Sequence, residues 1–467
     1  MDICVQTDCG MYGAERNDLH IKKNEDTKET MEERVRERID YYRKIINSRS
    51  IYRDAFQKQK ENSLYNTAMI PVLIEFVVWV IGQAEQQSIK RLYFLSRDGY
   101  QMFLVAKDLC RKMNIDIEIR YLNVSRYSMR VPEYAMLGEK CMDRIFIGGI
   151  DVTFRRIMRR AALTDEEIND VAKECDMDNE LDRMLNYQEI MTLKSKFADN
   201  RKLLDYIQKH SKKAYPNAIG YLRQEGLLDD IKYGLVDSGW VGTLQQTIRH
   251  LTQKDRIDGF YFGLYEIPKD EASDMYHGFY FNPKTGLDRK SYFSNCLFEA
   301  VLTSPEGMTV GYSKEADRYI PQMDMEQNPN KEIIQDNVRQ LLNYLNQINI
   351  YDKQSDVQFV ERLLKPLMAH PTKTEVEEFG NLLFSDDVLE GNLKKVAAEL
   401  SHEEIVNQRF IPKMLIMLGI SKKEIHESAW IEGSIVRLGE SVDRSLRSAE
   451  RYKKFVYIRK RIQMRMR

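Results

Sequence analysis

The sequence has few cysteines, almost no net charge and no long uninterrupted apolar run. Its 467 residues include six cysteines, and 71 Lys and Arg nearly balance 72 Asp and Glu. A net charge of −1 gives no overall field that would favour nucleic acid or a strongly acidic partner, so we expect no nucleic-acid partner. With 43% hydrophobic and 31% charged residues, the composition is typical of a soluble globular protein of two or three domains.

The cysteines are dispersed and form neither CxxC pairs nor Cys/His pairs. This pattern argues against a zinc site and predicts reduced, mostly structural thiols in a cytoplasmic protein. The first twenty residues lack the charged-then-apolar layout of a signal peptide. The six cysteines are Cys4, Cys9, Cys110, Cys141, Cys175 and Cys296.

One segment, residues 68–81 (AMIPVLIEFVVWVI), is apolar enough to suggest a membrane. It is too short to span a bilayer, and it contains Pro71 and Glu75. We therefore expect a buried helix that packs on a sheet.

Residues 233–246, YGLVDSGWVGTLQQ, contain an apolar run that ends at Asp237, a small-residue loop and a helical pattern. Glycines let backbone approach an anion closely, and free N–H groups at a helix start point at it. Asp237 would lie at the carboxyl end of a strand, where open α/β sheets place ligands. The alternative is an ordinary strand-to-helix turn. The loop consists of Ser238, Gly239, Trp240, Val241, Gly242 and Thr243.

A second strand-turn-helix pattern lies upstream, with a strand at 91–95, a helix at 100–109 and another strand at 115–124. This spacing predicts a βαβ unit and a parallel sheet. Arginine binds phosphate bidentately, so Arg97 in the turn and Arg126 after the second strand are candidate anion ligands. The alternative for Arg97 is a surface ion pair. Two such loops at strand ends favour a ligand that bears a diphosphate. The turn consists of Ser96, Arg97, Asp98 and Gly99.

The remaining segments are mostly helical in pattern. Glu299 lies near the start of an apolar helix and is either a buried structural acid or a catalytic one. The last 24 residues carry ten Lys and Arg against one Glu, interleaved with apolar residues, and are either a solvated tail or a helix that lies on an anionic membrane. The predicted organisation is a polar, helical extension (1–64), an α/β core (65–135 and 231–325), a helical hood inserted into it (136–230), a helical C-terminal domain (326–443) and the basic amphipathic tail (444–467).

The two loop motifs are similar to those of type I phosphoribosyltransferases, which bind 5-phosphoribosyl 1-pyrophosphate (PRPP). VDSGWVGT resembles their PRPP motif, and LYFLSRDGY resembles their pyrophosphate loop. Ser238 stands where that family usually has a second acid, and the loop is about one residue shorter. The resemblance implies a parallel-sheet core of the type I phosphoribosyltransferase kind, with the large helical insertion and helical C-terminal region added to it.

The strings YFLSRDG, YLNVSR, VDSGWVGTLQ and FEAVLTSPEGMTVGY, in this order, also resemble proteins of bacterial capsule and O-antigen gene clusters. This resemblance covers residues 69–312. Many of those proteins carry an N-terminal haloacid-dehalogenase-type phosphatase domain, whereas the start of this chain has no DxDxT-like motif. The resemblance implies a glycan ribofuranosylation system in which a transferase moves phosphoribosyl from PRPP and a separate phosphatase trims it.

The expected function is therefore a PRPP-dependent glycan phosphoribosyltransferase, a pentosyltransferase, with a lipid-linked or polysaccharide acceptor. The resemblance implies that 238–243 bind the 5-phosphate, that Ser96 to Gly99 and Arg126 bind pyrophosphate, and that Asp237 contacts the ribose hydroxyls. Mg²⁺ would bridge pyrophosphate and ribose. Asp98 or Glu299 would orient or deprotonate the acceptor.

Trp240 would stack on the acceptor sugar or pack in the core. The alternative function is a non-catalytic or hydrolase-type accessory protein of surface polysaccharide biosynthesis. In either case we expect the protein in the cytoplasm, where the basic tail suits the inner face of the plasma membrane.

Overall fold

The computed structural model describes residues 35–58, 63–149, 151–325, 328–350, 353–385, 393–418, 420–421, 423 and 425–465. Cys4, Cys9 and most of the predicted polar extension lie outside the described residues. The other four cysteines are buried thiols, as predicted.

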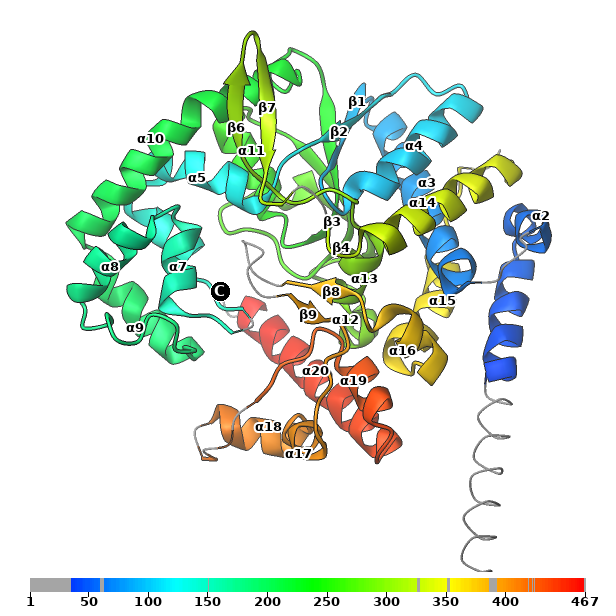
Figure 1. Cartoon of the computed structure of the whole chain (residues 1–467). Helices are drawn as coiled ribbons and strands as arrows, with labels where there is room; N and C mark the ends of the chain where they lie inside the picture. Colours follow the sequence, from blue (N-terminus) through cyan, green and yellow to red (C-terminus); the bar gives the residue numbers. More distant parts are fainter. Residues whose placement is uncertain are drawn as a thin grey trace, which may run out of the picture.

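A parallel sheet of five strands forms the centre of the molecule, in the order β2-β1-β3-β4-β5 (Figure 1). Every neighbouring pair of its strands is parallel, which confirms the predicted α/β class. The chain runs outward from β1 to β2 and then returns to the other side of β1 with β3. This reversal creates a topological switch point between β1 and β3, the place where open α/β sheets bind ligands. The strands are β1 (Arg91–Leu95), β2 (Glu118–Leu122), β3 (Tyr233–Trp240), β4 (Asp258–Leu264) and β5 (Tyr276–Phe281).

Helices cover both faces of the sheet because the inner strands are apolar on both sides. Alternate residues of β1 enter different cores: Leu92 and Phe94 pack with α3 (Ile70–Gln86) and α4 (Gly99–Lys112). Tyr93 and Leu95 pack instead with α5 (Arg126–Leu137), α10 (Arg201–Gln224) and α11 (Thr243–Thr252). A strand that is buried on both faces reads as a continuous apolar run, which is the RLYFL pattern of β1.

The apolar segment at 68–81 lies inside α3, and the prediction of a buried core helix is confirmed. The helical span Tyr65–Gln86 is long and apolar enough to cross a membrane by length and composition, yet 83% of its most apolar window is buried within the protein. Glu75 within it is 1% exposed and accepts hydrogen bonds from the Tyr52 hydroxyl (2.8 Å) and the Asp356 N–H (2.6 Å). Arg49 lies 3.1 Å away and supplies the opposite charge. The acid is thus a paired structural group, as buried carboxylates require.

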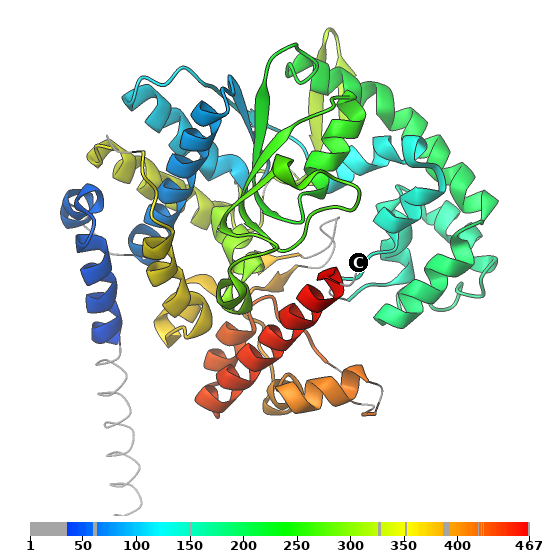
Figure 2. The same ribbon diagram turned by 180° about the vertical axis from the view of Figure 1, so that it is seen from behind.

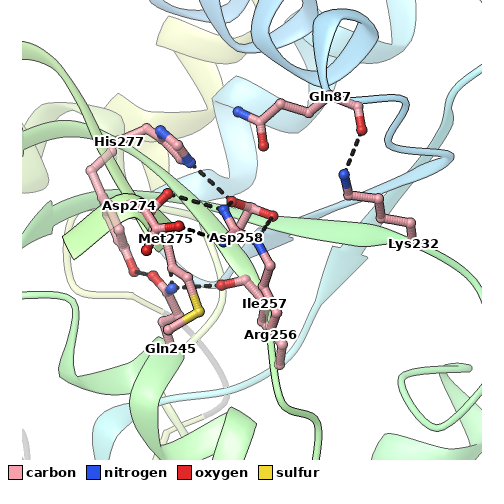
Figure 3. Close-up of polar contacts among 10 residues, drawn as sticks. Gln87, Lys232, Gln245, Arg256, Ile257, Asp258, Asp274, Met275 and His277 are labelled. Carbon is pink, nitrogen blue, oxygen red and sulfur yellow. Dashed lines mark hydrogen bonds and ion pairs between the residues drawn. The ribbon is translucent and has the colours of Figure 1, made fainter. Parts of the chain in front are cut away.

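A polar network closes the amino edge of the sheet, where β4 and β5 begin (Figure 3). Asp258 is 1% exposed and accepts a hydrogen bond from Arg256 (2.7 Å), while His277 Nε2 lies 3.0 Å from the same carboxylate. Gln245 of α11 donates to two backbone carbonyls beside it, and Lys232 donates to a carbonyl at the end of α3 (2.6 Å). These contacts tie the amino ends of β4 and β5 to α11, and the segment before β3 to the end of α3.

The insertion between β2 and β3 forms a helical lobe with its own core, seen beside the sheet in Figures 1 and 2. Side chains cap the helices of this lobe: Thr164 and Glu167 form a capping box, and Asn200 caps α10. After α5, the lobe consists of η2 (Gly138–Cys141), α6 (Met142–Ile145), α7 (Phe154–Arg160), α8 (Asp165–Lys173), α9 (Tyr187–Phe197) and α10.

The C-terminal region is helical, as predicted, but it also contains a short hairpin formed by β8 (Leu383–Phe384) and β9 (Lys394–Lys395). It packs against the sheet layer, because Leu341, Phe359 and Trp430 belong to the same buried cluster as α3. The other elements are α2 (Ser50–Lys58), η1 (Tyr65–Met69), η3 (Ser273–Met275), α12 (Leu287–Tyr292), α13 (Asn295–Leu302), the hairpin of β6 (Thr309–Glu315) and β7 (Arg318–Met323), α14 (Lys331–Gln347), α15 (Val357–Ala369), α16 (Lys373–Phe379), α17 (His402–Asn407), α18 (Phe410–Met417), α19 (Ile431–Leu438) and α20 (Val442–Arg465).

Candidate ligand site at the carboxyl edge of the sheet

A cavity of about 360 Å³ lies where β1 and β3 end, at the switch point of the sheet. Every sequence-predicted site residue except Gly99 lines it. Gly99 is instead the first residue of α4 and packs against β1, since a Cβ there would lie 3.0 Å from the Phe94 carbonyl carbon. The predicted residues that line the cavity are Ser96, Arg97, Asp98, Arg126, Asp237, Ser238, Gly239, Trp240, Val241, Gly242, Thr243 and Glu299.

Two carboxylates line this cavity: Asp98 in the turn after β1 and Asp237 near the end of β3. The Ser238 hydroxyl donates to Asp98 Oδ2 (2.5 Å), and the Ser238 N–H donates to Asp237 Oδ1 (2.9 Å). Ser238 therefore joins the two carboxylates, and its hydroxyl points at an acid rather than at a phosphate. Ser238 thus connects the carboxyl end of β3 to the turn that follows β1.

Burial raises the pKa of both carboxylates. For Asp237 the neighbouring Asp98 charge raises the pKa further, and the Ser238 N–H and Arg126 only partly oppose this. For Asp98 the Ser238 hydroxyl, Arg97 and Arg126 counteract burial without cancelling it. Two acids in this arrangement resist carrying two negative charges at once. A cation, or positive charge developing on a ligand between them, would be strongly favoured there.

The loop after β3 is shorter than the sequence predicted. We expected a loop over 238–243, but β3 continues through Trp240, which pairs with Leu264 of β4, and Gly239 pairs with Gly263. Only Val241 and Gly242 separate the strand from α11. The predicted extent of the loop was therefore wrong. The physical reason is Gly239, whose φ of +113° and lack of a side chain let β3 approach the Gly263 carbonyl, where a Cβ would lie at 2.5 Å.

The amino end of α11 and a buried arginine form one corner of the cavity. Gly242 has φ +72° and precedes Thr243, the first residue of α11. Arg130 of α5 is 6% exposed and its Nη2 donates to Thr243 Oγ1 (3.0 Å). Its Nη1 has no hydrogen-bond partner among the described residues. A buried guanidinium with an unused donor, beside the amino end of a helix, is an arrangement that suits an anion.

The charges around Arg130 support the same interpretation. Burial lowers the pKa of Arg130 to about 10; Tyr134 opposes this, while Arg126 and Arg144 lower the pKa further. Arg126, Arg130 and Arg144 thus lie close enough to repel one another, and Glu133 partly offsets this repulsion. Sequence reasoning missed Arg130. The available signal was its spacing of four residues from Arg126, which places both on one face of α5.

The two loops that follow β1 and β2 are tied to each other. The peptide bond between Ser96 and Arg97 is cis, and the Ser96 hydroxyl donates to the Val124 carbonyl (2.7 Å). Arg97 and Arg126 both line the cavity, and both lower the pKa of Asp98. Arg126 is exposed at the rim, whereas Arg130 lies deeper.

Trp240 and Glu299 are joined on the opposite wall. The Trp240 Nε1–H donates to Glu299 Oε1. The Trp240 ring also packs against Phe293 (5.4 Å between ring centroids) and Tyr265 (5.9 Å). Trp240 therefore packs in the core, and Glu299 is a paired acid, as the structural alternatives for these residues predicted. Both side chains also line the cavity.

The C-terminal region supplies part of this wall, which the sequence did not predict. The Asn330 side chain exchanges two hydrogen bonds with the backbone of Leu383 (2.8 and 2.9 Å) and so fixes the start of the β8–β9 hairpin. The lining residues from this region are Asn328, Pro329, Asn330, Leu383, Phe384, Ser385 and Leu393.

No group of three or more His, Cys, Asp or Glu side chains that could hold a metal ion occurs among the described residues. The acid pair offers two hard oxygen donors, which suits an ion that takes its other ligands from phosphate and water. No protein-family model matches the chain, and no curated protein matches its sequence.

Proposed function

We propose that this cavity binds PRPP and that the chain transfers its phosphoribosyl group to a hydroxyl of a glycan. The observation that carries the proposal is Arg130, a buried guanidinium bonded to Thr243 with one N–H unused. Thr243 begins the helix that follows Asp237 along the chain. A phosphate at this corner would supply the missing acceptor and offset the repulsion among Arg126, Arg130 and Arg144.

The rest of the cavity suits the other groups of PRPP. With the 5-phosphate at Arg130 and the amino end of α11, the ribose would lie beside Asp237, whose carboxylate accepts hydrogen bonds from its 2- and 3-hydroxyls. The pyrophosphate would then lie near Arg97 and Arg126. The strand order 2-1-3-4-5 and the site at the β1/β3 switch point support a core similar to type I phosphoribosyltransferases.

The transfer exchanges one bond at C1 of the ribose for another. An acceptor hydroxyl oxygen attacks C1, the bond from C1 to the pyrophosphate oxygen breaks, and pyrophosphate leaves with the electron pair. Asp237 favours the positive charge that develops on the ribose, and Arg97 and Arg126 stabilise the departing anion. The acceptor proton passes to Asp98 or to Glu299, the two remaining acids of the lining. Mg²⁺ fits the donor set, and Asp237 would hold it together with oxygens of the ligand; when bound it would neutralise the pyrophosphate charge.

Calorimetric titration tests this proposal directly. PRPP should bind the purified protein in the presence of Mg²⁺, and removing Mg²⁺ with EDTA should weaken binding. Asp237→Asn should abolish binding of PRPP while the thermal unfolding temperature stays at or above that of the wild type. Ribose 5-phosphate should bind more weakly, and its binding should depend on Arg130 but hardly on Mg²⁺. Failure of the folded protein to bind either compound would refute the transferase and leave the non-catalytic accessory function. Release of inorganic phosphate from sugar phosphates would favour a hydrolase instead.

A further inference from the structure

Exposed apolar side chains are concentrated at one corner of the molecule. Sixteen large hydrophobic residues are exposed in the part of the chain that the structure describes, and eight of them belong to α18, the turn after it and the second half of α20. Single exposed apolar residues are ordinary on a soluble protein, but a concentrated group marks an interaction surface. The eight residues are Ile411, Leu415, Met417, Leu418, Ile420, Phe455, Ile458 and Ile462; we call this group the α18–α20 face.

Helix α20 is docked on the protein and presents one row of side chains to solvent. Its inner side is held by Leu446 (7% exposed), Ala449 (5%) and Tyr457, whose ring stacks on Tyr265 at 5.4 Å. The exposed row recurs every three or four residues, as one face of a helix does. Its first half is cationic and its second half apolar: Arg444, Arg447, Arg451, Phe455, Ile458 and Ile462.

Helix α18 lies against α20 and extends this face. The Phe410 ring is 5.7 Å from Phe455, and Lys413 Nζ lies 4.8 Å from the centre of the Tyr452 ring. Figures 1 and 2 show α18 beside α20 from both sides. The outward row of α18 and the turn after it is apolar and highly exposed, with Ile411 at 68% and Leu418 at 65%.

We propose that the α18–α20 face binds the surface of an anionic lipid bilayer. A helix that lies in a membrane interface combines an apolar row with Lys and Arg beside it, and this is the arrangement of α20. Exposed Arg459 and Arg461 add positive charge beside Ile458 and Ile462. The acid Glu450 is neutralised by Lys454 at 2.8 Å. Anionic headgroups attract such cations, and the apolar rows then enter the acyl boundary.

The basic tail is only one part of this surface. The sequence predicted only a basic amphipathic helix at the end of the chain. In the structure, α18 and the turn after it supply five of the eight exposed apolar residues of the α18–α20 face. The surface is formed by two packed helices, so it is preorganised. The proposal is independent of which ligand occupies the cavity.

Vesicle flotation with the full chain tests the proposal. We expect the protein to float with phosphatidylcholine vesicles that contain phosphatidylglycerol, to float poorly with pure phosphatidylcholine, and to be released by salt. The double variant Ile411→Ser with Leu418→Ser should lower the partition coefficient by on the order of tenfold or more. Arg447→Gln with Arg451→Gln should lower it by on the order of tenfold, mainly at low salt.

A matched control uses two exposed apolar residues of α14, Ile333 (47% exposed) and Leu342 (44%). Ile333→Ser with Leu342→Ser should leave partition unchanged, and all variants should titrate with PRPP as the wild type does, whatever that result is. Absence of flotation with anionic vesicles, or equal partition of the α18 variant and the control, would overturn the proposal. Loss of self-association in analytical ultracentrifugation, caused by the α18 variant without any vesicle binding, would instead identify an interface between copies of this chain.

Discussion

Arg130 allows stability and ligand binding to be separated by one substitution, Arg130→Met. Burial lowers the pKa of Arg130 well below the ordinary arginine value, to about 10, and one pKa unit corresponds to about 1.4 kcal/mol. Because the pKa of this base is lower in the folded state, its charge destabilises the fold at every pH below about 10. At neutral pH the penalty is therefore fully present and amounts to about 3 kcal/mol.

The substitution should stabilise the protein while it weakens binding. Methionine keeps the apolar stem but loses the hydrogen bond to Thr243, which contributes about 1 kcal/mol. The net expectation is an increase of about 2 kcal/mol in the free energy of unfolding, measured by urea denaturation. PRPP affinity, measured by calorimetry, should fall by about 30-fold to 150-fold, because a charge-assisted hydrogen bond to phosphate contributes about 2–3 kcal/mol.

Arg160 provides the matched control. It is 2% exposed, and its Nη1 donates to the carbonyls of Ile145 (3.2 Å) and Ile147 (2.6 Å). Arg160→Met leaves those carbonyls without their donor and should destabilise the protein by about 2–3 kcal/mol, with PRPP affinity unchanged. The reasoning is wrong if Arg130→Met destabilises the protein as much as Arg160→Met does and still binds PRPP with wild-type affinity.

Four further substitutions, one of them a control, test the structure around the site and the lobe. Gly239→Ala should lower the free energy of unfolding by about 3 kcal/mol or more, because the new Cβ would lie 2.5 Å from a backbone oxygen. Its control is Gly138→Ala: Gly138 also has a positive φ, but no atom lies within 4 Å of the new Cβ, so the loss should be only about 1 kcal/mol. Equal urea midpoints for the two variants would refute this. Ser238→Ala removes the 2.5 Å hydrogen bond to Asp98 and should cost about 1–3 kcal/mol; an unchanged midpoint would show that this bond is not needed. Although burial raises the pKa of Glu167, hydrogen bonds from a backbone N–H, a histidine and a lysine lower it to about 2. Glu167 should therefore add about 1–2 kcal/mol at pH 7, allowing for solvent screening, and this contribution should disappear as pH falls from about 4.5 to about 2. Glu167→Gln should reduce the pH dependence of stability in that range, and an unaltered pH profile would contradict the assignment.

Local pattern determined much of the core of this protein. Continuous apolar runs followed by small polar turns predicted the strands that became β1 and β3, and helical spacing predicted α4 and α11. Capping residues such as Thr164 begin helices through contacts with residues only three positions away. These signals are local, because hydrogen-bond periodicity and capping depend on residues within a few positions of each other. The carboxyl ends of parallel strands lie at the same edge of a sheet. Residues predicted at those strand ends therefore lie together, and nearly all of them line one cavity.

The tertiary structure decided what depends on distant partners. Gly239 extends β3 because β4 lies beside it, and no local pattern contains that pairing. Arg130 is a candidate ligand-binding residue only because it is buried beside Thr243 at the start of α11. Glu299 is held in place by the hydrogen bond from the indole of Trp240. Likewise, helical spacing shows that α18 has an apolar row, but only packing decides whether that row is buried or exposed. The sequence alone thus determined which helices and strands form and which strand ends carry polar side chains. Burial and long-range contacts determined which charged side chains lack a partner and which apolar side chains stay exposed to solvent.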